Sequence, residues 1–266
     1  MNPMFWPTAL LAVLLFWLGT VAERCIVLPA TRKVFLVIAA AFAAPGLLYV
    51  LYYTKLLGQP SWFFELRSWR YTELAGAGVG LLFGYIHHCR HKHPSLRRQL
   101  RRGTMPAIFA VVIAVPFLKP VVRPVDFRQM QDRWEGDVCL QSTPSTCGPA
   151  SAATILRSLG KDVTEVELAR ECFTYAGGTE IWYLARSLRK RGCSVEFKTM
   201  DLGDAALFLP AVAGVRLREG TGHFITLLRN DGTNFIGNDP LTGKFKATLS
   251  ELQTDYRFTG SFLLIK

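Results

Sequence analysis

The sequence predicts an α-helical membrane anchor followed by an α+β domain, in which N-terminal helices pack on an antiparallel sheet. Residues 1–122 consist mainly of long apolar stretches with few acidic residues. Residues 127–266 instead show short, periodic apolar runs separated by Gly, Pro, Asn and Asp. The mean hydropathy of +0.22 is also high for a protein without membrane segments. We therefore expect an anchor of three or four helices over 1–122 and a separate domain over 127–266.

Three stretches of the first domain have the length and composition of membrane-spanning helices, namely 4–21, 34–53 and 105–122. A fourth stretch, 71–86, is shorter, rich in glycine and contains Glu73, so whether it crosses the membrane is left open. The first stretch lacks the basic n-region of a signal peptide and is followed by further spans. We expect it to be retained as a helix, with the lipid bilayer as a partner of the chain.

The basic residues are concentrated beside these apolar stretches. Residues 1–120 hold 13 Lys and Arg against 3 Asp and Glu, whereas residues 121–266 hold 18 against 17. The net charge of +11 therefore does not predict a nucleic-acid partner. The basic stretch 87–104 contains no acidic residue, and short basic loops stay in the cytoplasm. Because 105–122 crosses next, the sequence predicts a multi-pass protein of the inner membrane with its second domain on the extracytoplasmic side.

The same basic stretch contains a cluster of potential metal ligands: His87, His88, Cys89, His91 and His93. Such clusters can bind a metal ion. The spacing fits no structural zinc pattern, however, and the neighbouring arginines would repel a cation. We therefore expect no metal here and interpret the stretch as a solvated loop that contacts anionic lipid headgroups.

The second domain is expected to begin with helices and to continue with strands. A Thr164–Glu167 capping box precedes one helix, and Gly192 ends another. The predicted helices cover 147–159, 165–173 and 180–191. The predicted strands cover 194–199, 211–217, 223–228, 234–236, 244–248 and 261–265.

Cys147 is a candidate nucleophile because it begins a predicted helix, within Thr-Cys-Gly-Pro. The positive end of the helix dipole favours a thiolate over a thiol. A thiolate is the nucleophile that acyl-transfer chemistry needs. A single cysteine is more often a small buried apolar residue, so the prediction depends on partners elsewhere in the domain.

Three residues could complete a site around Cys147. His223 is the only histidine in residues 94–266 and is therefore the only candidate base within the domain. Asp239 follows the next predicted strand, and a tight turn would bring its carboxylate back to the imidazole; Asn238 is an alternative orienting residue. Gln141 precedes the cysteine by six residues, and its amide could stabilise an oxyanion together with the Cys147 backbone N–H.

These motifs resemble the bacteriocin-processing cysteine peptidases, a papain-like family that cleaves leader peptides after a double glycine. The resemblance rests on Gln-Ser-Thr-Pro-Ser-Thr-Cys-Gly-Pro-Ala from Gln141, Gly-His-Phe-Ile-Thr-Leu around His223 and Asp-Pro-Leu-Thr-Gly from Asp239, and it covers about residues 135–266. It implies a papain-like fold, with Gln141, Cys147, His223 and Asp239 as the site residues. In the best-known members this domain precedes an ABC transporter and works in the cytoplasm. No Walker motif occurs here, so we expect no nucleotide partner and no cofactor, and a polypeptide at the membrane surface as substrate.

The second domain contains three further cysteines, Cys139, Cys172 and Cys193. In an oxidising compartment two of them could pair, and we expect a disulfide between Cys172 and Cys193, with three buried thiols as the alternative.

Two other functions fit the same residues. A thiol-dependent acyltransferase acting on a lipoprotein or lipid would share the first half-reaction with a peptidase. A non-catalytic peptide-binding module would not need Cys147, His223 and Asp239 together. We therefore expect a cysteine peptidase.

Overall fold

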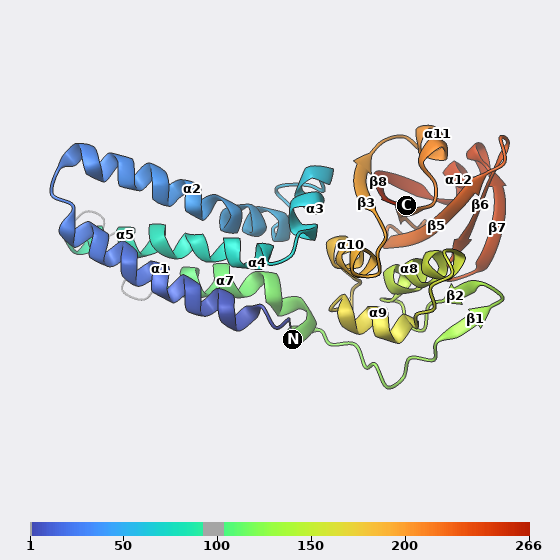
Figure 1. Cartoon of the computed structure of the whole chain (residues 1–266), viewed down its shortest axis with the longest axis horizontal. Helices are drawn as coiled ribbons and strands as arrows, with labels where there is room; N and C mark the ends of the chain where they lie inside the picture. Colours follow the sequence, from blue (N-terminus) through green and yellow to red (C-terminus); the bar gives the residue numbers. More distant parts are fainter. Residues whose placement is uncertain (1, 93–103) are drawn as a thin grey trace. The chain divides into compact units, whose positions relative to one another are not determined.

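A computed structural model describes residues 2–92 and 104–266. Contacts between Cα atoms divide the chain into two compact units (Figure 1). The first unit comprises Met1–Gly58 and Tyr71–Lys119, and the second comprises Gln59–Arg70 and Pro120–Lys266. The second unit therefore includes a short segment that lies between two of the predicted membrane helices. The domain boundary near residue 122 stays a prediction.

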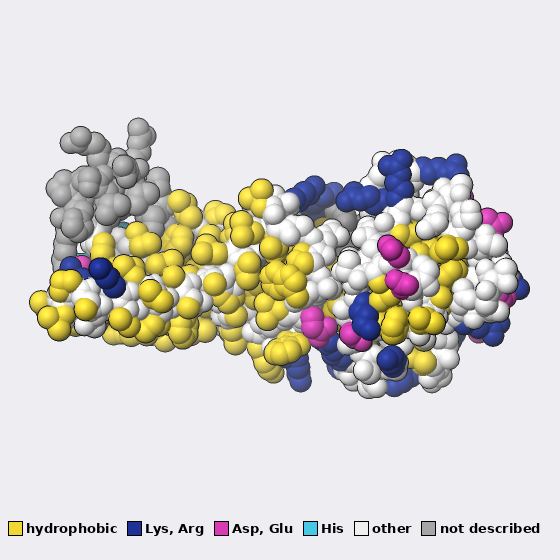
Figure 2. All heavy atoms as spheres, turned by 90° about the horizontal axis from the view of Figure 1, so that it is seen from above, with side chains coloured by type: hydrophobic (Ala, Val, Ile, Leu, Met, Phe, Trp, Pro, Cys, Tyr) yellow, Lys and Arg dark blue, Asp and Glu magenta, His cyan; other side chains and the backbone are white. Residues whose placement is uncertain are grey.

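The first unit is helical. Two of its helices, Phe5–Cys25 and Pro29–Tyr53, are long and apolar enough to cross a membrane by length and composition alone, and the last helix has a shorter apolar part, Pro106–Val122. Many large apolar side chains are exposed on these helices, including Leu10 and Val37, each 70% exposed (Figure 2). The elements are α1 (Phe5–Cys25), α2 (Pro29–Tyr53), α4 (Thr72–Ala75), the 3-10 turn η1 (Gly76–Gly78), α5 (Val79–Lys92) and α7 (Thr104–Val122). Most of the basic stretch, and with it His93 of the His and Cys cluster, lies outside the described residues.

Glycines allow α1 and α5 to pack with their backbones in contact. A Cβ atom at Gly80 would collide with the carbonyl of Ala12, and one at Gly84 would collide with the carbonyl of Phe16. Glycines four residues apart lie on one face of a helix, and this spacing is typical of helix pairs within membranes. The two glycines therefore allow α5 to lie against the backbone of α1.

The second unit is built on a six-stranded antiparallel sheet of strand order β3-β8-β4-β5-β6-β7. Its strands are β3 (Val195–Thr199), β4 (Ala211–Arg216), β5 (Gly222–Asn230), β6 (Asn234–Asp239), β7 (Gly243–Thr248) and β8 (Arg257–Ile265). A separate hairpin is formed by β1 (Arg133–Glu135) and β2 (Val138–Leu140). The helical elements are α3 (Ser61–Ser68), α8 (Cys147–Ser158), α9 (Glu165–Glu171), α10 (Ile181–Lys190), α11 (Leu202–Ala205), η2 (Ala206–Phe208) and α12 (Leu249–Asp255).

This architecture confirms the predicted class, helices followed by an antiparallel sheet. The six predicted strands all form, and β5, β6, β7 and β8 extend beyond the predicted ranges. The sequence prediction missed the β1–β2 hairpin and the short helices α3, α11 and α12. Each of these elements is too short to show a clear apolar period.

Hydrogen bonds fix α8 to the sheet. The Ser151 hydroxyl donates to the carbonyl of Phe224 at 3.2 Å, and the Thr226 hydroxyl donates to the carbonyl of Ser151 at 3.3 Å. The alternate residues of β5, Ile225 and Leu227, belong to the apolar core with α11 and α12. These two hydrogen bonds therefore fix the position of the start of α8 beside β5.

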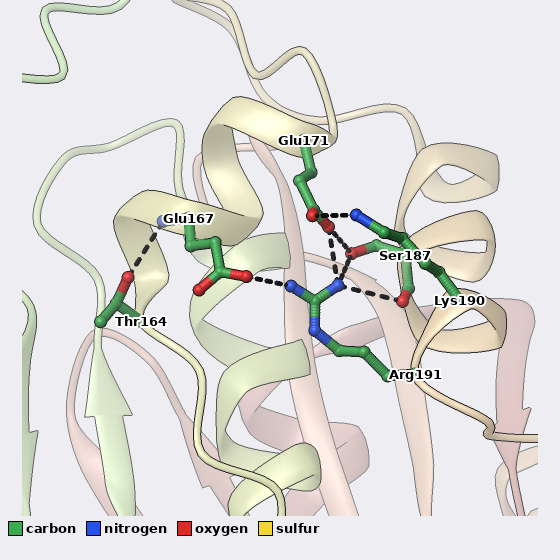
Figure 3. Close-up of polar contacts among 6 residues, drawn as sticks. All are labelled: Thr164, Glu167, Glu171, Ser187, Lys190 and Arg191. Atoms are coloured by element: carbon green, nitrogen blue, oxygen red, sulfur yellow. Dashed lines mark hydrogen bonds and ion pairs between the residues drawn. The ribbon is translucent and has the colours of Figure 1, made fainter.

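The start of α9 differs from the predicted capping box. The Thr164 hydroxyl does accept from the Glu167 backbone N–H, at 3.1 Å. The Glu167 carboxylate, however, binds Arg191 at 2.5 Å instead of returning to the N-cap (Figure 3). A full capping box forms at α12, between Thr248 and Glu251.

The segment Gln59–Arg70 contributes an aromatic cluster to the second unit. The ring of Phe64 lies 6.2 Å from that of Trp182 and 5.7 Å from that of Phe197. The guanidinium of Arg67 lies 5.1 Å from the Trp182 ring centre. Glu65 of the same helix forms an ion pair with Arg189 at 2.7 Å. Aromatic packing and an ion pair therefore hold α3 on α10 and β3.

The predicted Cys172–Cys193 disulfide is wrong, because both cysteines are free and buried. The Cys172 thiol hydrogen-bonds to Ser187, and burial raises its pKa. The alternative of buried thiols describes Cys139, Cys172 and Cys193 in this structure.

Candidate active site

Cys147 is the first residue of α8 and is 5% exposed. Gly148 allows this helix start to approach its neighbours: a Cβ atom there would lie 2.9 Å from Leu184 of α10 and 3.4 Å from Phe224 of β5. The first N–H groups of a helix have no partner within the helix and form the positive end of its dipole. The thiol therefore lies where a negative charge is stabilised.

His223 lies between Cys147 and Asp239. It is the second residue of β5, and Asp239 is the last residue of β6. The His223 Nε2 atom is 2.8 Å from Asp239 Oδ1, and a further side-chain hydrogen bond joins His223 to Cys147. Because Nε2 is engaged by the carboxylate, Nδ1 is the ring nitrogen that faces the thiol. The antiparallel pairing of β5 and β6 brings His223 and Asp239 together, and the start of α8 places Cys147 beside the imidazole.

Asp239 is itself fixed by two further donors. The Tyr256 hydroxyl donates to Oδ2 at 2.7 Å, and the Leu241 backbone N–H donates to Oδ1 at 2.8 Å. Burial acts to raise the pKa of Asp239, but the hydrogen bonds from His223, Tyr256 and Leu241 lower it below its usual value. The carboxylate is therefore ionised when it faces the imidazole.

The pKa of His223 is raised to about 9. Burial acts in the opposite direction and lowers it, but the hydrogen bonds to Asp239 and Cys147 favour the charged imidazole and outweigh burial. At neutral pH the ring therefore carries a proton on each nitrogen. A charged imidazolium beside a thiol stabilises the thiolate.

Gln141 lies on the wall of a cleft next to this group. Its backbone N–H donates to the carbonyl of Pro240 at 2.9 Å, and its side-chain Nε2 donates to the carbonyl of Thr143 at 2.8 Å. An amide nitrogen has two N–H groups, so one remains for a ligand. The Oε1 atom is buried and accepts no hydrogen bond from the described residues. The amide therefore has unused hydrogen-bonding capacity at the cleft.

Asn238, the alternative orienting residue, lies elsewhere. Successive side chains of a strand point to opposite faces, so Asn238 and Asp239 diverge. Asn238 pairs in register with Thr226, and its buried Oδ1 has no hydrogen-bond partner among the described residues. The imidazole of His223 is held by Asp239.

A cleft of about 450 Å³ opens beside His223. It is walled by the segment that precedes Cys147 and by the turns after β4 and β6. The lining residues are Gln141, Ser142, Thr143, Pro144, Leu217, Glu219, Thr221, Gly222, His223 and Leu241. The mostly uncharged lining suits a peptide rather than a compact charged ligand.

Cys139 is not a competing nucleophile. It is fully buried, and burial, together with the carboxylates of Glu165 and Asp132, raises the pKa of its thiol. Its backbone N–H donates to the Thr154 hydroxyl at 3.0 Å. Within residues 2–92 and 104–266, no group of three His, Cys, Asp or Glu side chains is arranged to hold a metal ion.

The sequence prediction missed Tyr256. This residue follows α12, 17 positions after the aspartate it contacts. The capping box at Thr248 and Glu251 could have revealed the preceding helix. The direction of the hydroxyl depends on the packing of that helix, which no local pattern encodes.

A family model described as the peptidase C39 family matches residues 136–266. An uncharacterized protein of Methanothermobacter marburgensis is 32% identical over 126 residues, which are 47% of this chain and 85% of that protein. An uncharacterized protein of Methanothermobacter thermautotrophicus is 30% identical over 129 residues, which are 48% of this chain and 87% of that protein.

Two similar solved structures also cover this part of the chain. The peptidase domain of Streptococcus ComA, a bifunctional ABC transporter involved in quorum sensing, is 18% identical with a TM-score of 0.43, over 48% of this chain and 96% of that one. A double glycine motif protease from an AMS/PCAT transporter, solved with a leader peptide, is 23% identical with a TM-score of 0.43, over 48% of this chain and 89% of that one. The family resemblance predicted from the motifs is confirmed by the family model. The chain therefore belongs, through residues 136–266, to the peptidase C39 family and is a cysteine peptidase.

Proposed function

We propose that the chain is a membrane-bound peptidase whose nucleophile is Cys147, with His223 as acid and base, Asp239 as orienting carboxylate and Gln141 as oxyanion donor. The contact of His223 with both Cys147 and Asp239 is the observation that carries the proposal. A base that touches the nucleophile and is held by a third group is the arrangement that activates a thiol.

The chemistry follows from these positions. The Cys147 thiolate attacks the carbonyl carbon of the scissile peptide bond, and the carbonyl oxygen takes the negative charge. The second N–H of the Gln141 amide and the Cys147 backbone N–H donate to that oxygen. The imidazolium of His223 gives its Nδ1 proton to the leaving amine as the C–N bond breaks, which leaves a thioester on Cys147. Water then attacks the thioester, His223 takes its proton, and the carboxylic acid and the thiolate–imidazolium pair are released.

The proposed substrate is a polypeptide at the membrane surface. The volume and the mostly uncharged lining of the cleft beside His223 support an extended peptide as the substrate. The family resemblance adds a double glycine before the cleaved bond, so a peptide containing Gly-Gly is the first probe. No contact in the described residues favours the acyltransferase or the non-catalytic module.

The proposed site of action is the extracytoplasmic face of a membrane. The helix α3 packs within the second unit, so the loop between α2 and α4 lies on the same side of the bilayer as the peptidase. If α7 crosses the membrane, the helix α5 before it must cross as well. The backbone contact of α5 with α1 through Gly80 and Gly84 supports this fourth crossing.

Cysteine labelling tests this topology. Gly58→Cys and Ser95→Cys are introduced in a chain in which Cys25, Cys89 and Cys147 are replaced by serine. In intact cells, we expect a membrane-impermeant maleimide to label position 58 and to label position 95 only after lysis. Labelling of both positions in intact cells would contradict the crossing of α5 and α7.

The rate of thiol alkylation tests the proposed function. The purified full chain in detergent is treated with iodoacetamide near pH 7, and the labelled cysteine is identified by mass spectrometry. We expect Cys147 to react fastest and its rate to fall about tenfold or more in His223→Ala, because the thiolate loses its counter-ion. An ordinary thiol rate, unchanged in the variant, would contradict the catalytic pair and favour a binding module.

A further inference from the structure

Glu165 is a buried carboxylate that the proposed mechanism does not use. It is the first residue of α9 and is 0% exposed. Its Oε1 accepts from the Ser142 backbone N–H at 2.9 Å, and its Oε2 accepts from the Ser142 hydroxyl. Among the described residues, no Lys, Arg or His forms an ion pair with it. A buried carboxylate is costly unless it is hydrogen-bonded, so both oxygens depend on Ser142.

Ser142 is the neighbour of Gln141 in the segment that leads to Cys147. The backbone of this segment is fixed at two successive residues: Gln141 N–H binds the Pro240 carbonyl, and Ser142 N–H binds Glu165. The direction in which the Gln141 side chain leaves the backbone depends on both bonds. Removal of the second bond would free the Ser142 backbone from α9 and leave Gln141 with only its own bonds to Pro240 and Thr143.

The helix that carries Glu165 is itself held firmly. The Glu165 backbone N–H donates to Asp132 at 2.7 Å. On the rest of α9, Glu167 and Glu171 both bind Arg191, at 2.5 and 2.6 Å (Figure 3). Burial acts against the charge of Glu171, but hydrogen bonds from Arg191 and its neighbours lower the pKa of Glu171 to about 2. The backbone of α9 is therefore held in place where the Glu165 carboxylate extends to Ser142.

We propose that Glu165 is a positioning residue for the oxyanion donor Gln141. The inference rests on the proposed function and adds a residue that touches neither substrate nor nucleophile. An oxyanion donor must lie about 2.7–3.1 Å from the developing charge, and a displacement of about 1 Å can cost about a hundredfold in rate. The bonds to Ser142 keep the Gln141 amide within that range. No bond from Glu165 reaches His223 or Cys147, so the thiolate is independent of it.

The test compares two reactions of Cys147 in the full chain. Attack on a carbonyl uses the oxyanion donors, whereas alkylation by iodoacetamide does not. In Glu165→Ala we expect kcat for a fluorogenic Gly-Gly peptide to fall about 10–100-fold with KM nearly constant. The affinity for a peptide aldehyde, which forms a tetrahedral adduct with the thiol, should fall by a similar factor. Alkylation of Cys147 should stay within about twofold of wild type.

Three further variants separate positioning from a general structural role. Glu167→Gln on the same helix should leave hydrolysis unchanged, because the amide oxygen of glutamine still accepts from Arg191 and the side chain does not contact the cleft. Glu165→Gln keeps an acceptor for Ser142 N–H and should restore most of the activity. The double variant Gln141→Ala/Glu165→Ala should hydrolyse the peptide no more slowly than Gln141→Ala alone, because Glu165 acts through Gln141.

Each outcome is decisive. The positioning role would be overturned if Glu165→Ala hydrolysed the peptide at the wild-type rate. It would also be overturned if the two substitutions had multiplicative effects on kcat in the double variant, or if alkylation and hydrolysis fell in parallel. In all of these cases the alkylation of Cys147 would still depend on His223. Alkylation that does not depend on His223 in the wild-type chain would instead overturn the proposed function, and the inference with it.

Discussion

Replacement of Asp239 by asparagine is expected to lower kcat for a Gly-Gly peptide about 10²–10⁴-fold, which corresponds to about 3–5.5 kcal/mol of transition-state stabilisation. The carboxylate holds His223 through Nε2 at 2.8 Å and stabilises the imidazolium. An asparagine that presents its NH2 group to Nε2 would force the proton onto Nδ1. The nitrogen that faces Cys147 could then no longer accept the thiol proton.

The same change is expected to move the alkaline limb of the pH profile. In the wild type, His223 has a raised pKa of about 9, so the imidazolium that protonates the leaving amine is lost as the pH rises through about 9. Without the charge of Asp239, the interaction that raises the pKa of His223 weakens, whereas burial still lowers that pKa. The limb should therefore shift towards the ordinary histidine value of about 6.5 or below.

The measurement is kcat and kcat/KM between pH 5 and 10 for the wild type and for Asp239→Asn. Asp204→Asn is the matched control, since Asp204 is an exposed residue of α11 that makes no contact with the site. An Asp239→Asn enzyme with an unchanged alkaline limb would show that the carboxylate does not set the charge of His223.

Replacement of Phe64 by alanine is expected to destabilise the second unit by about 3–5 kcal/mol, the usual cost of removing a buried phenylalanine. Phe64 is 4% exposed and lies between Trp182 and Phe197. Its loss would leave a cavity between α3, α10 and β3. For a unit of this size the unfolding midpoint should fall by about 6–20 °C.

In a chain in which Cys25 and Cys89 are replaced by serine and Cys147 has been alkylated, thermal exposure of the buried thiols to a fluorogenic maleimide reports the unfolding of this unit. These thiols are Cys139, Cys172 and Cys193. Trp62→Ala is the matched control on the same helix, because Trp62 is 52% exposed and should shift the midpoint by only a few degrees. Equal shifts for the two variants would contradict the docking of α3 through its buried face.

Local patterns of the sequence were sufficient to select the residues of the proposed site, because these residues lie at the ends of regular elements. Cys147 begins a helix, and a cysteine before Gly-Pro signals that start directly. His223 and Asp239 lie on consecutive antiparallel strands, so a short turn alone brings them together. His223 is the only histidine in residues 94–266, so it was the only candidate base within the domain.

The sequence by itself therefore determined the α+β order of the second unit, and it predicted the long apolar helices and the residues Cys147, His223 and Asp239 that the proposed function uses. Only the tertiary structure decided that Tyr256 contacts the aspartate, that Glu165 binds the segment beside Gln141, that Cys172 and Cys193 form no disulfide, and that α3 packs on α10 and β3. The physical reason is the range of the interactions. Periodicity and capping act within a few residues, whereas these contacts join side chains that are distant in sequence and meet only when the sheet and its helices have packed.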